Sequence, residues 1–373
     1  MARRAGRAGH PGRARTRHRA ARGRGAAQGG GLGRAGRGYR PAAGGRARAA
    51  GSRRSTLQGN REGTEVIPVQ SEALPRVTAV ITTYNRRNVV PDAVASALAQ
   101  TVRDIEVLVV DDGSADGTAD DLAERFGHDA RLRVVTRPNG GAPAARNTGL
   151  DHARGPFVAL LDSDDLWDPG YLESQLAVFA AKPWADLVID DGICEEPDGS
   201  VRRLSAYANW VLPDSIDALC RGTWILPSLT VVRTAAARDI RFDVALRRCD
   251  DTDFIWRFVD AGYRVAGNPE PLGRYRALPP GQTQAAPQLS LDEDRLLLAT
   301  YDIWKRYRDR YPQVLDRGFD FHLEYARRLM RGGRQEEAHW HIERMLRERP
   351  AHPATVRLAA EAGLRQPAGP PAP

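Results

Sequence analysis

Three carboxylates stand directly after an apolar run, and residues of this type at this spacing could bind a metal ion. The run is FVALL, Phe157–Leu161, and Asp162, Asp164 and Asp165 follow it. A continuous apolar run bounded by polar residues is typical of a strand buried on both faces. Charges at the end of such a strand are costly unless a partner satisfies them. If the chain stays extended, Asp162 and Asp164 project to the same side, and two oxygen ligands suit Mg²⁺ or Mn²⁺ better than zinc.

A helix cap is the alternative interpretation of the same acidic segment. Asp168 is a good capping residue, and Pro169 fits the first position of a helix. An isolated DSDD is therefore consistent with a metal site or with a capping loop. The neighbouring elements have to decide between the two, and we expect the capping role to fall on Asp168.

The elements that must position these carboxylates alternate between strands and helices. Short apolar strands are predicted at 77–82, 105–110, 132–136 and 157–161, and helices at 89–100, 119–126 and from about 142. This alternation predicts an α/β fold with a mostly parallel sheet and helices on both faces.

Polar residues follow each predicted strand. They include Thr82–Asn85, Asp111–Asp112 and Asp162–Asp165, and ligands bind outside the carboxyl ends of strands in open parallel sheets. The helix after Gly140–Gly141 can direct its free amides, with Arg146 in its first turns, at an anion. Together these groups suit a nucleoside diphosphate bridged by a metal ion.

Four segments in this order resemble family 2 glycosyltransferases with the GT-A (Rossmann-like) fold. They read VTAVITTYNR, VVDDGSADGT, NGGAPAARNTGL and LLDSDDLWDP. The match is dense over Val77–Pro183 and thinner to about Arg276. The resemblance implies a set of donor-binding positions: Thr82, Tyr84 and Asp112 at the nucleotide base, Arg146 near the base and phosphates, Asp162 at the ribose and Asp164 at the metal.

The resemblance also implies a catalytic base in the second half. In RRCDDTDFIWRF, the family pattern assigns the general base to Asp251, with Asp250 at the preceding acidic position and Arg257 on the following helix. Asp250 stands where Glu is more usual, so both carboxylates remain candidates for the base. The alternative is that these acids, with Asp253, only stabilise the N-terminus of the helix.

The resemblance implies an inverting, metal-dependent glycosyltransferase that uses a nucleoside-diphosphate sugar. The acceptor would be a hydroxyl of a glycan, of a lipid-linked molecule or of a small molecule. The alternative function is a non-catalytic nucleotide-sugar-binding protein with a helical tail that docks another protein. We expect a nucleotide-sugar-binding half at 74–190, an acceptor and catalytic-base half at 191–283, and a small α-helical C-terminal region at 284–373.

A basic arm precedes these regions. Residues 1–60 contain sixteen arginines and no acidic residue, whereas the formal charge of the whole chain is +8, so the remainder carries a net −8. We expect residues 1–73 to be disordered, or to be upstream sequence translated from a start placed too early. Charge alone would allow the arm to bind nucleic acid. It contains only Tyr39 as an aromatic residue, so we expect no nucleic-acid partner.

The remaining features bear on location. Cys194, Cys220 and Cys249 are odd in number and lack CxxC spacing, which favours reduced thiols in a cytoplasmic protein. No stretch of eighteen apolar residues predicts a transmembrane segment, and peripheral membrane association stays open.

The C-terminal region resembles one helix-turn-helix repeat of the tetratricopeptide kind, over Phe321–Pro350. A single repeat cannot form an array, so it is expected to pack on the catalytic body or to form a partner surface. His339 and His341 lie two residues apart in a predicted helix and point to different faces, and we expect both to be solvated.

Overall fold

The computed structural model describes residues 74–196, 198–206, 212, 216–220, 226–246, 248–276, 293–315 and 318–364. The predicted arm over residues 1–73 lies outside these ranges. The strands are β1 (Val77–Thr83), β2 (Ile105–Asp111), β3 (Leu132–Thr136), β4 (Phe157–Asp162), β5 (Leu166–Trp167), β6 (Leu187–Asp190), β7 (Ile193–Glu195), β8 (Val201–Arg203), β9 (Thr230–Arg233), β10 (Val265–Asn268) and β11 (Gly273–Arg276). The helices are α1 (Val90–Leu98), α2 (Thr118–Phe126), α3 (Ala142–His152), α4 (Tyr171–Ala181), α5 (Ile216–Cys220), α6 (Thr234–Ile240), α7 (Asp250–Asp260), α8 (Glu293–Tyr307), α9 (Phe319–Arg331), α10 (Gln335–Glu348) and α11 (Pro353–Glu361).

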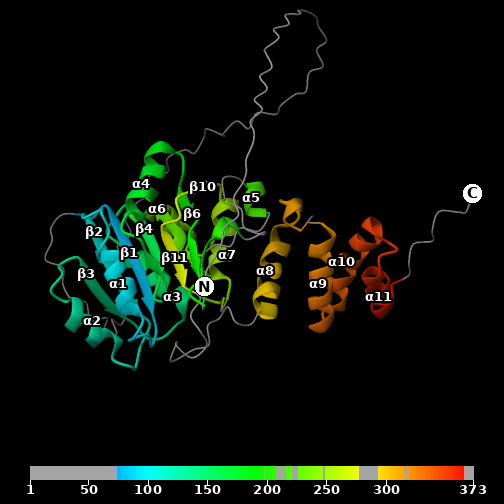
Figure 1. Cartoon of the computed structure of the whole chain (residues 1–373), viewed down its shortest axis with the longest axis horizontal. Coiled ribbons are helices and arrows are strands. Elements are labelled where there is room, and N and C mark those ends of the chain that lie inside the picture. Colours follow the sequence, from blue (N-terminus) through cyan, green and yellow to red (C-terminus); the bar gives the residue numbers. More distant parts are fainter. Residues whose placement is uncertain are drawn as a thin grey trace, which may run out of the picture. The chain divides into compact units, whose positions relative to one another are not determined.

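A seven-stranded sheet in the order β10-β6-β9-β4-β1-β2-β3 forms the centre of the α/β part (Figure 1). The pairs β1·β2, β1·β4, β2·β3 and β6·β10 are parallel, and β9 runs antiparallel to both of its neighbours. All seven residues of β2 are buried. Burial on both faces explains why its sequence, IEVLVVD, is a nearly continuous apolar run instead of an alternating one.

Helices cover both faces of this sheet, as the alternation of elements predicted. One apolar cluster joins α1, α2 and α4 to one face, and a second joins α3, α6 and α7 to the other. A second sheet, ordered β5-β11-β7-β8, lies beside the acidic segment after β4, because β5 follows that segment directly. The two sheets together hold the turn that follows β4.

The predicted cap at Asp168 is wrong. Helix α4 begins at Tyr171, and its N-cap residue is Gly170, which makes no side-chain hydrogen bond. Strand β11 pairs with β5 and brings Arg274 close. Its guanidinium donates to both carboxylate oxygens of Asp168, at 2.6 and 3.0 Å. Asp168 therefore forms an ion pair with a strand more than a hundred residues away in the chain instead of capping α4.

The C-terminal helices α8–α11 form a third apolar cluster, which also contains Trp256 from α7. The Trp256 ring stacks on Tyr307, with 5.2 Å between ring centroids. Arg310 adds an ion pair to Asp260 at the end of α7, at 2.6 Å. The helical region therefore packs on the helix that carries the predicted catalytic base.

His341 is fully buried, so the prediction that it is solvated is wrong. Its Nδ1 lies 3.0 Å from Nδ1 of His322, which is also buried. The i, i+2 spacing did separate the two histidines of HWH. It placed His341 on the inner face of α10 with Ile342 and Met345, while the half-buried His339 reaches Ala362 O at 3.0 Å. Burial, followed by the charge of His322, lowers the pKa of His341 to about 3.

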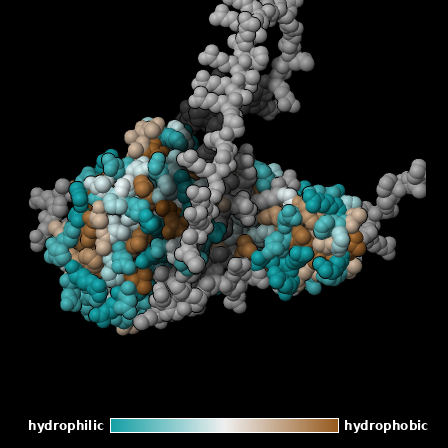
Figure 2. Space-filling model, in the orientation of Figure 1, coloured by the Kyte–Doolittle hydropathy of each residue, from teal (hydrophilic) through white to brown (hydrophobic). Residues whose placement is uncertain are grey.

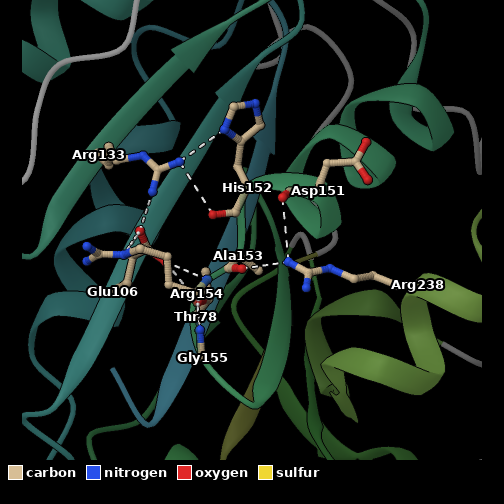
Figure 3. Close-up of polar contacts among 9 residues, drawn as sticks. All are labelled: Thr78, Glu106, Arg133, Asp151, His152, Ala153, Arg154, Gly155 and Arg238. Carbon is tan, nitrogen blue, oxygen red and sulfur yellow. Dashed lines mark hydrogen bonds and ion pairs between the residues drawn. The ribbon is translucent and has the colours of Figure 1, made fainter. Parts of the chain in front are cut away.

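A network of buried polar side chains lies at the amino ends of β1, β2 and β3 (Figure 3). Glu106 is its centre: Oε1 accepts from Arg133 at 2.6 Å and from Arg154 at 3.0 Å, and Oε2 accepts from Thr78 Oγ1 at 2.8 Å. Arg133 Nη2 also donates to the carbonyl of His152, at 3.4 Å. We call Thr78, Glu106, Arg133, His152 and Arg154 the amino-edge network. It fixes the end of α3 to the sheet.

The described surface is mixed in character (Figure 2). The large apolar side chains that are exposed come from separate segments: Leu74, Tyr84, Trp184, Val201, Val244 and Val356. Within the described ranges, no helix combines the length and the apolar composition needed to cross a membrane. The three cysteines are buried and form no disulfide.

Candidate functional site

The carboxyl ends of β1, β2 and β4 lie side by side. In the register of the parallel pairs, Thr82 is opposite Asp162, and Thr83 is opposite Asp111. The end of β1, the acidic pair after β2 and the acidic segment after β4 therefore meet at one edge of the sheet, where open parallel sheets bind ligands.

Arg146 joins two acidic segments at this edge. Its Nη2 donates to Asp162 Oδ1 at 2.8 Å, and its Nη1 donates to Asp250 Oδ2. The Arg146 side chain is only 8% exposed, and its guanidinium lies 5.5 Å from the centre of the Phe242 ring. Burial lowers the pKa of Arg146, but the charges of Asp250 and Asp162 outweigh it and hold the pKa above its ordinary value. Arg146 is thus a fixed cation between β4 and the start of α7.

Asp251 lies in the first turn of α7, beside this arginine. It is half-buried, and its Oδ1 accepts from the backbone N of Thr252 at 2.6 Å. Burial, with the neighbouring charge of Asp250, raises the pKa of Asp251 to about 7, although Arg146 lowers it. Helix α7 has no side-chain cap hydrogen bond, and its N-cap residue is Cys249 with φ +56°. The geometry therefore provides a carboxylate that can exchange a proton near neutral pH.

The carboxylates after β4 have different surroundings. Asp164 is 17% exposed at its side chain, and its Oδ2 accepts from Arg86 Nη1 at 2.9 Å. Asp165 is buried, and it accepts from Ser228 Oγ at 2.5 Å and from the backbone N of Arg276 at 3.0 Å. Burial, with the charges of Asp164 and Asp162, raises the pKa of Asp165. Asp165 fastens the segment to its neighbours, whereas Asp162 and Asp164 stay accessible.

We call Arg86, Arg146, Asp162, Asp164, Asp165, Asp250 and Asp251 the carboxyl-edge cluster. It contains five carboxylates and two arginines. A third guanidinium, that of Arg276, donates to the backbone carbonyl of Asp164 at 2.5 Å, and the carboxylates still outnumber the guanidinium groups by five to three. Charge of one sign in this excess favours an added cation.

The donor set fits a hard divalent ion that also binds phosphate. Among the described residues, no group of three or more His, Cys, Asp or Glu side chains is arranged to hold a metal. Asp162 and Asp164 are partly exposed carboxylates, and the bonds found to their side chains leave one oxygen of each without a protein donor. Mg²⁺ in proteins is bound through one or two carboxylates plus the phosphates of a substrate. The two aspartates suit that arrangement better than a site made wholly of protein ligands.

Asp112 holds the glycine-rich loop before α3. It is 3% exposed, and Oδ2 accepts from the backbone N of Gly141 at 2.7 Å and of Gly140 at 3.1 Å. Arg137 also donates to its Oδ1. Asp112 therefore positions the start of α3 at the edge of the site. Tyr84, by contrast, is 41% exposed at the end of β1, where its ring is accessible.

A cavity of about 490 Å³ lies along α3 next to the cluster. It is lined by Arg137, Ala144, Asn147, Thr148, Asp151, Arg241, Phe242, Asp243 and Val244. Phe242 is also the ring against the Arg146 guanidinium. The cavity is open to solvent, and none of its lining residues belongs to the carboxyl-edge cluster.

The structure adds Arg86, Ser228 and the fastening role of Asp165 to the residues singled out from the sequence. Arg86 could have been found, because it ends the VTAVITTYNR segment. Ser228 carries no such signal, because it follows Pro227 in a short 3₁₀ turn far from the acidic segment in the chain.

Comparison with known proteins supports the family resemblance of the sequence. The model of the family described as "Glycosyl transferase family 2" matches residues 78–219. The chain is 34% identical over 149 residues to a chondroitin synthase of Pasteurella multocida, a match that covers 39% of this chain and 15% of that protein. It is 34% identical over 210 residues to the succinoglycan biosynthesis protein ExoW of Rhizobium meliloti, covering 52% of this chain and 66% of that protein.

Two solved structures share the fold. The mannosyltransferase PcManGT from Pyrobaculum calidifontis, in complex with GDP-Man and Mn²⁺, matches with a TM-score of 0.52 at 20% identity and covers 80% of this chain and 83% of that one. S. aureus TarS 1-349 in complex with UDP-GlcNAc matches with a TM-score of 0.51 at 19% identity and covers 78% and 93%. The predicted GT-A-type α/β fold with an added helical region is confirmed.

Proposed function

The chain belongs to glycosyltransferase family 2 through residues 78–219, and on this premise we propose that it transfers a sugar from a nucleoside-diphosphate sugar to an acceptor hydroxyl, with inversion. One observation carries the proposal: Arg146 holds Asp162 of the donor-binding half and Asp250 of the second half at the same time. Asp251, the residue after Asp250, would then lie beside the bound donor.

The donor would lie across the carboxyl edge. We assign the nucleotide base to Thr82, Tyr84 and Asp112, and the ribose to Asp162. Arg146 would face the phosphates. The two similar structures are complexes with UDP-GlcNAc and with GDP-Man and Mn²⁺, which supports a nucleotide-sugar donor for this chain.

Asp164 would hold the divalent metal, Mg²⁺ or Mn²⁺. When bound, such an ion supplies positive charge that stabilises the departing diphosphate. Asp165 keeps Asp164 in place through Ser228 and the backbone of Arg276. Since the cluster already has an excess of carboxylates, a metal there would also relieve repulsion among them.

Asp251 would remove the proton of the acceptor hydroxyl. As the O–H bond breaks, the acceptor oxygen bonds to the anomeric carbon from the face opposite the diphosphate, and the bond from that carbon to the diphosphate oxygen breaks. A single displacement inverts the anomeric centre and needs no covalent intermediate on the protein. A pKa of about 7 leaves a useful fraction of Asp251 ionised at neutral pH.

The acceptor is proposed only by class. The two relatives are a chondroitin synthase and a succinoglycan biosynthesis protein, which supports a glycan acceptor; a lipid-linked or small-molecule acceptor also fits. The absence of disulfides among the three buried cysteines supports a reducing, cytoplasmic location as part of the proposal.

A transfer assay with UDP-, GDP- and dTDP-linked sugars and Mn²⁺ tests the proposal, with release of nucleoside diphosphate as the measurement. EDTA should stop release, and excess Mn²⁺ should restore it. Asp251→Asn should lower kcat by about 10²–10⁴-fold, the usual contribution of a general base, while donor affinity stays within about threefold.

Asp250→Asn is the matched variant, because it changes the adjacent carboxylate. A larger loss for Asp250→Asn than for Asp251→Asn would assign the base to Asp250. Donor binding without any turnover in the wild type, for every sugar tested, would favour a non-catalytic binding protein that uses its helical region to dock a partner.

A further inference from the structure

Arg86 forms an ion pair with Asp164, the carboxylate to which the proposed function assigns the metal. Its Nη1 donates to Asp164 Oδ2 at 2.9 Å, and the two side chains are 15% and 17% exposed. The pair joins the loop after β1 to the segment after β4, across 78 positions of the chain. A partly buried ion pair of this kind is less screened by solvent than one on the surface.

The backbone around Arg86 is fixed. Asn85 has φ +50°; its N donates to Ser114 Oγ at 2.8 Å, and its Oδ1 accepts from Ala115 N at 2.8 Å. The carbonyl of Arg86 accepts from Val89 N at 2.9 Å and from Val90 N at 3.0 Å, at the start of α1. The loop is therefore tied to the β2–α2 connection and to α1. Arg86 can therefore change its partner by a movement of its side chain alone.

Arg86 and a divalent ion cannot both be close to Asp164 without repulsion. The guanidinium carries one positive charge and the ion two, and a partly buried site screens them poorly. A diphosphate bound at this edge would bring negative charge and oxygen atoms. A guanidinium binds phosphate oxygens well, because its N–H groups form a planar fork.

We propose that Arg86 is the internal counter-ion of Asp164 in the donor-free protein and transfers to the donor diphosphate when the metal takes Asp164. This inference rests on the proposed nucleotide-sugar site. It makes Arg86 a donor-binding residue that also lowers the affinity of the free protein for the metal. Metal and diphosphate therefore bind with positive coupling, because each removes an obstacle to the other.

The test measures binding instead of turnover. Purified wild-type chain and Arg86→Gln are titrated with Mn²⁺ alone, with free Mn²⁺ followed by electron paramagnetic resonance. Both proteins are then titrated calorimetrically with inorganic pyrophosphate in the presence of Mn²⁺. Arg86→Gln should bind Mn²⁺ alone about tenfold more tightly, and pyrophosphate with Mn²⁺ about tenfold more weakly, as expected for one partly buried charge contact.

Arg87→Gln is the matched control. Arg87 is the next residue in the loop, its side chain is 50% exposed, and it pairs with Asp121 at 3.3 Å instead of with Asp164. Both affinities of this variant should equal those of the wild type. Asp164→Asn supplies a second control, because Arg86→Gln should no longer tighten Mn²⁺ binding in that background.

A purely structural role for Arg86 predicts the opposite sign. If the arginine only shaped the acidic segment, its loss would weaken Mn²⁺ binding. Mn²⁺ affinity that is unchanged or lower in Arg86→Gln, or pyrophosphate affinity that is unchanged, overturns the proposal. Failure of the proposed function would show elsewhere, as absence of nucleotide-sugar turnover by the wild type, since neither Mn²⁺ nor pyrophosphate binding depends on turnover.

Discussion

The two ends of the same parallel sheet carry arginine–carboxylate groups of opposite balance. In the amino-edge network one carboxylate, Glu106, meets two arginines, and both of its oxygens have protein donors. In the carboxyl-edge cluster five carboxylates share two arginines, and the pKa values of Asp165 and Asp251 are raised.

The difference indicates that the amino-edge network stabilises the fold, whereas the carboxyl-edge cluster is suited to binding a ligand. At the amino edge both oxygens of Glu106 are satisfied by donors of the chain itself, and the network fixes α3 to the sheet. Arg238 of α6 supports the same helix end by donating to the carbonyls of Leu150 and Ala153, at 2.8 and 2.7 Å. A cation at the C-terminus of a helix is also stabilised by the helix dipole. At the carboxyl edge the negative charge is in excess, and a cation bound with the substrate would complete it. Removing an acid should therefore have opposite effects at the two ends.

Glu106→Gln should give the largest change in stability. It leaves the guanidinium of Arg133 without its charged partner, and that side chain is 9% exposed. Loss of one partner of a buried ion pair typically costs about 3–5 kcal/mol. Urea denaturation should show this decrease in the free energy of unfolding, against a change below about 0.5 kcal/mol for the exposed control Glu124→Gln. A decrease below about 1 kcal/mol would mean that the two edges do not differ in this way.

Asp251→Asn should act in the opposite direction on stability. The folded-state pKa of about 7 lies above 3.8, the ordinary pKa of an aspartate, so the folded state holds this proton more tightly than the unfolded state does. The stabilisation from that proton is complete below about pH 4 and is lost as the pH rises through 7. The variant removes the buried charge, so its free energy of unfolding should exceed that of the wild type by about 1–2 kcal/mol at pH 8, after allowance for partial exposure.

At pH 4 the two proteins should unfold at nearly the same denaturant concentration. If Asp251→Asn is instead less stable at pH 8, the ionised carboxylate contributes to folding, and the cluster resembles the amino-edge network more than we infer.

Asp250→Asn should shift the pH profile of activity. The charge of Asp250 raises the pKa of Asp251, and its removal also leaves Arg146 to act more strongly on Asp251. The acid limb of kcat/KM, measured from pH 5 to 9, should move to lower pH by about half a unit, or about 0.7 kcal/mol. No movement would indicate that the limb reports another group, and movement to higher pH would contradict the charge argument.

Much of the fold and of the site could be predicted from local sequence. The apolar runs of β1, β2 and β4 specify buried strands, and the polar residues that follow each run are brought together by the parallel arrangement alone. The spacing alone therefore predicts that Asp162 and Asp164 lie at the carboxyl edge of the sheet.

Predictions were wrong where a residue distant in the chain contacts the side chain. Asp168 suited a helix cap, but Arg274 binds it. His341 was expected in solvent, but the inner face of α10 buries it against His322. Sequence periodicity gives the face on which a residue lies, and only the packing of neighbouring elements says what covers that face.

The order of strands and helices and the acidic ends of the strands follow from local sequence, because both depend on residues that are close in the chain. The partners of the individual acids follow only from the tertiary structure. Arg146 reaches Asp250 across 104 positions, Arg86 reaches Asp164 across 78, and Ser228 reaches Asp165 across 63. These contacts depend on sheet order and on the packing of α3 and α7, and short sequence patterns carry no information about either.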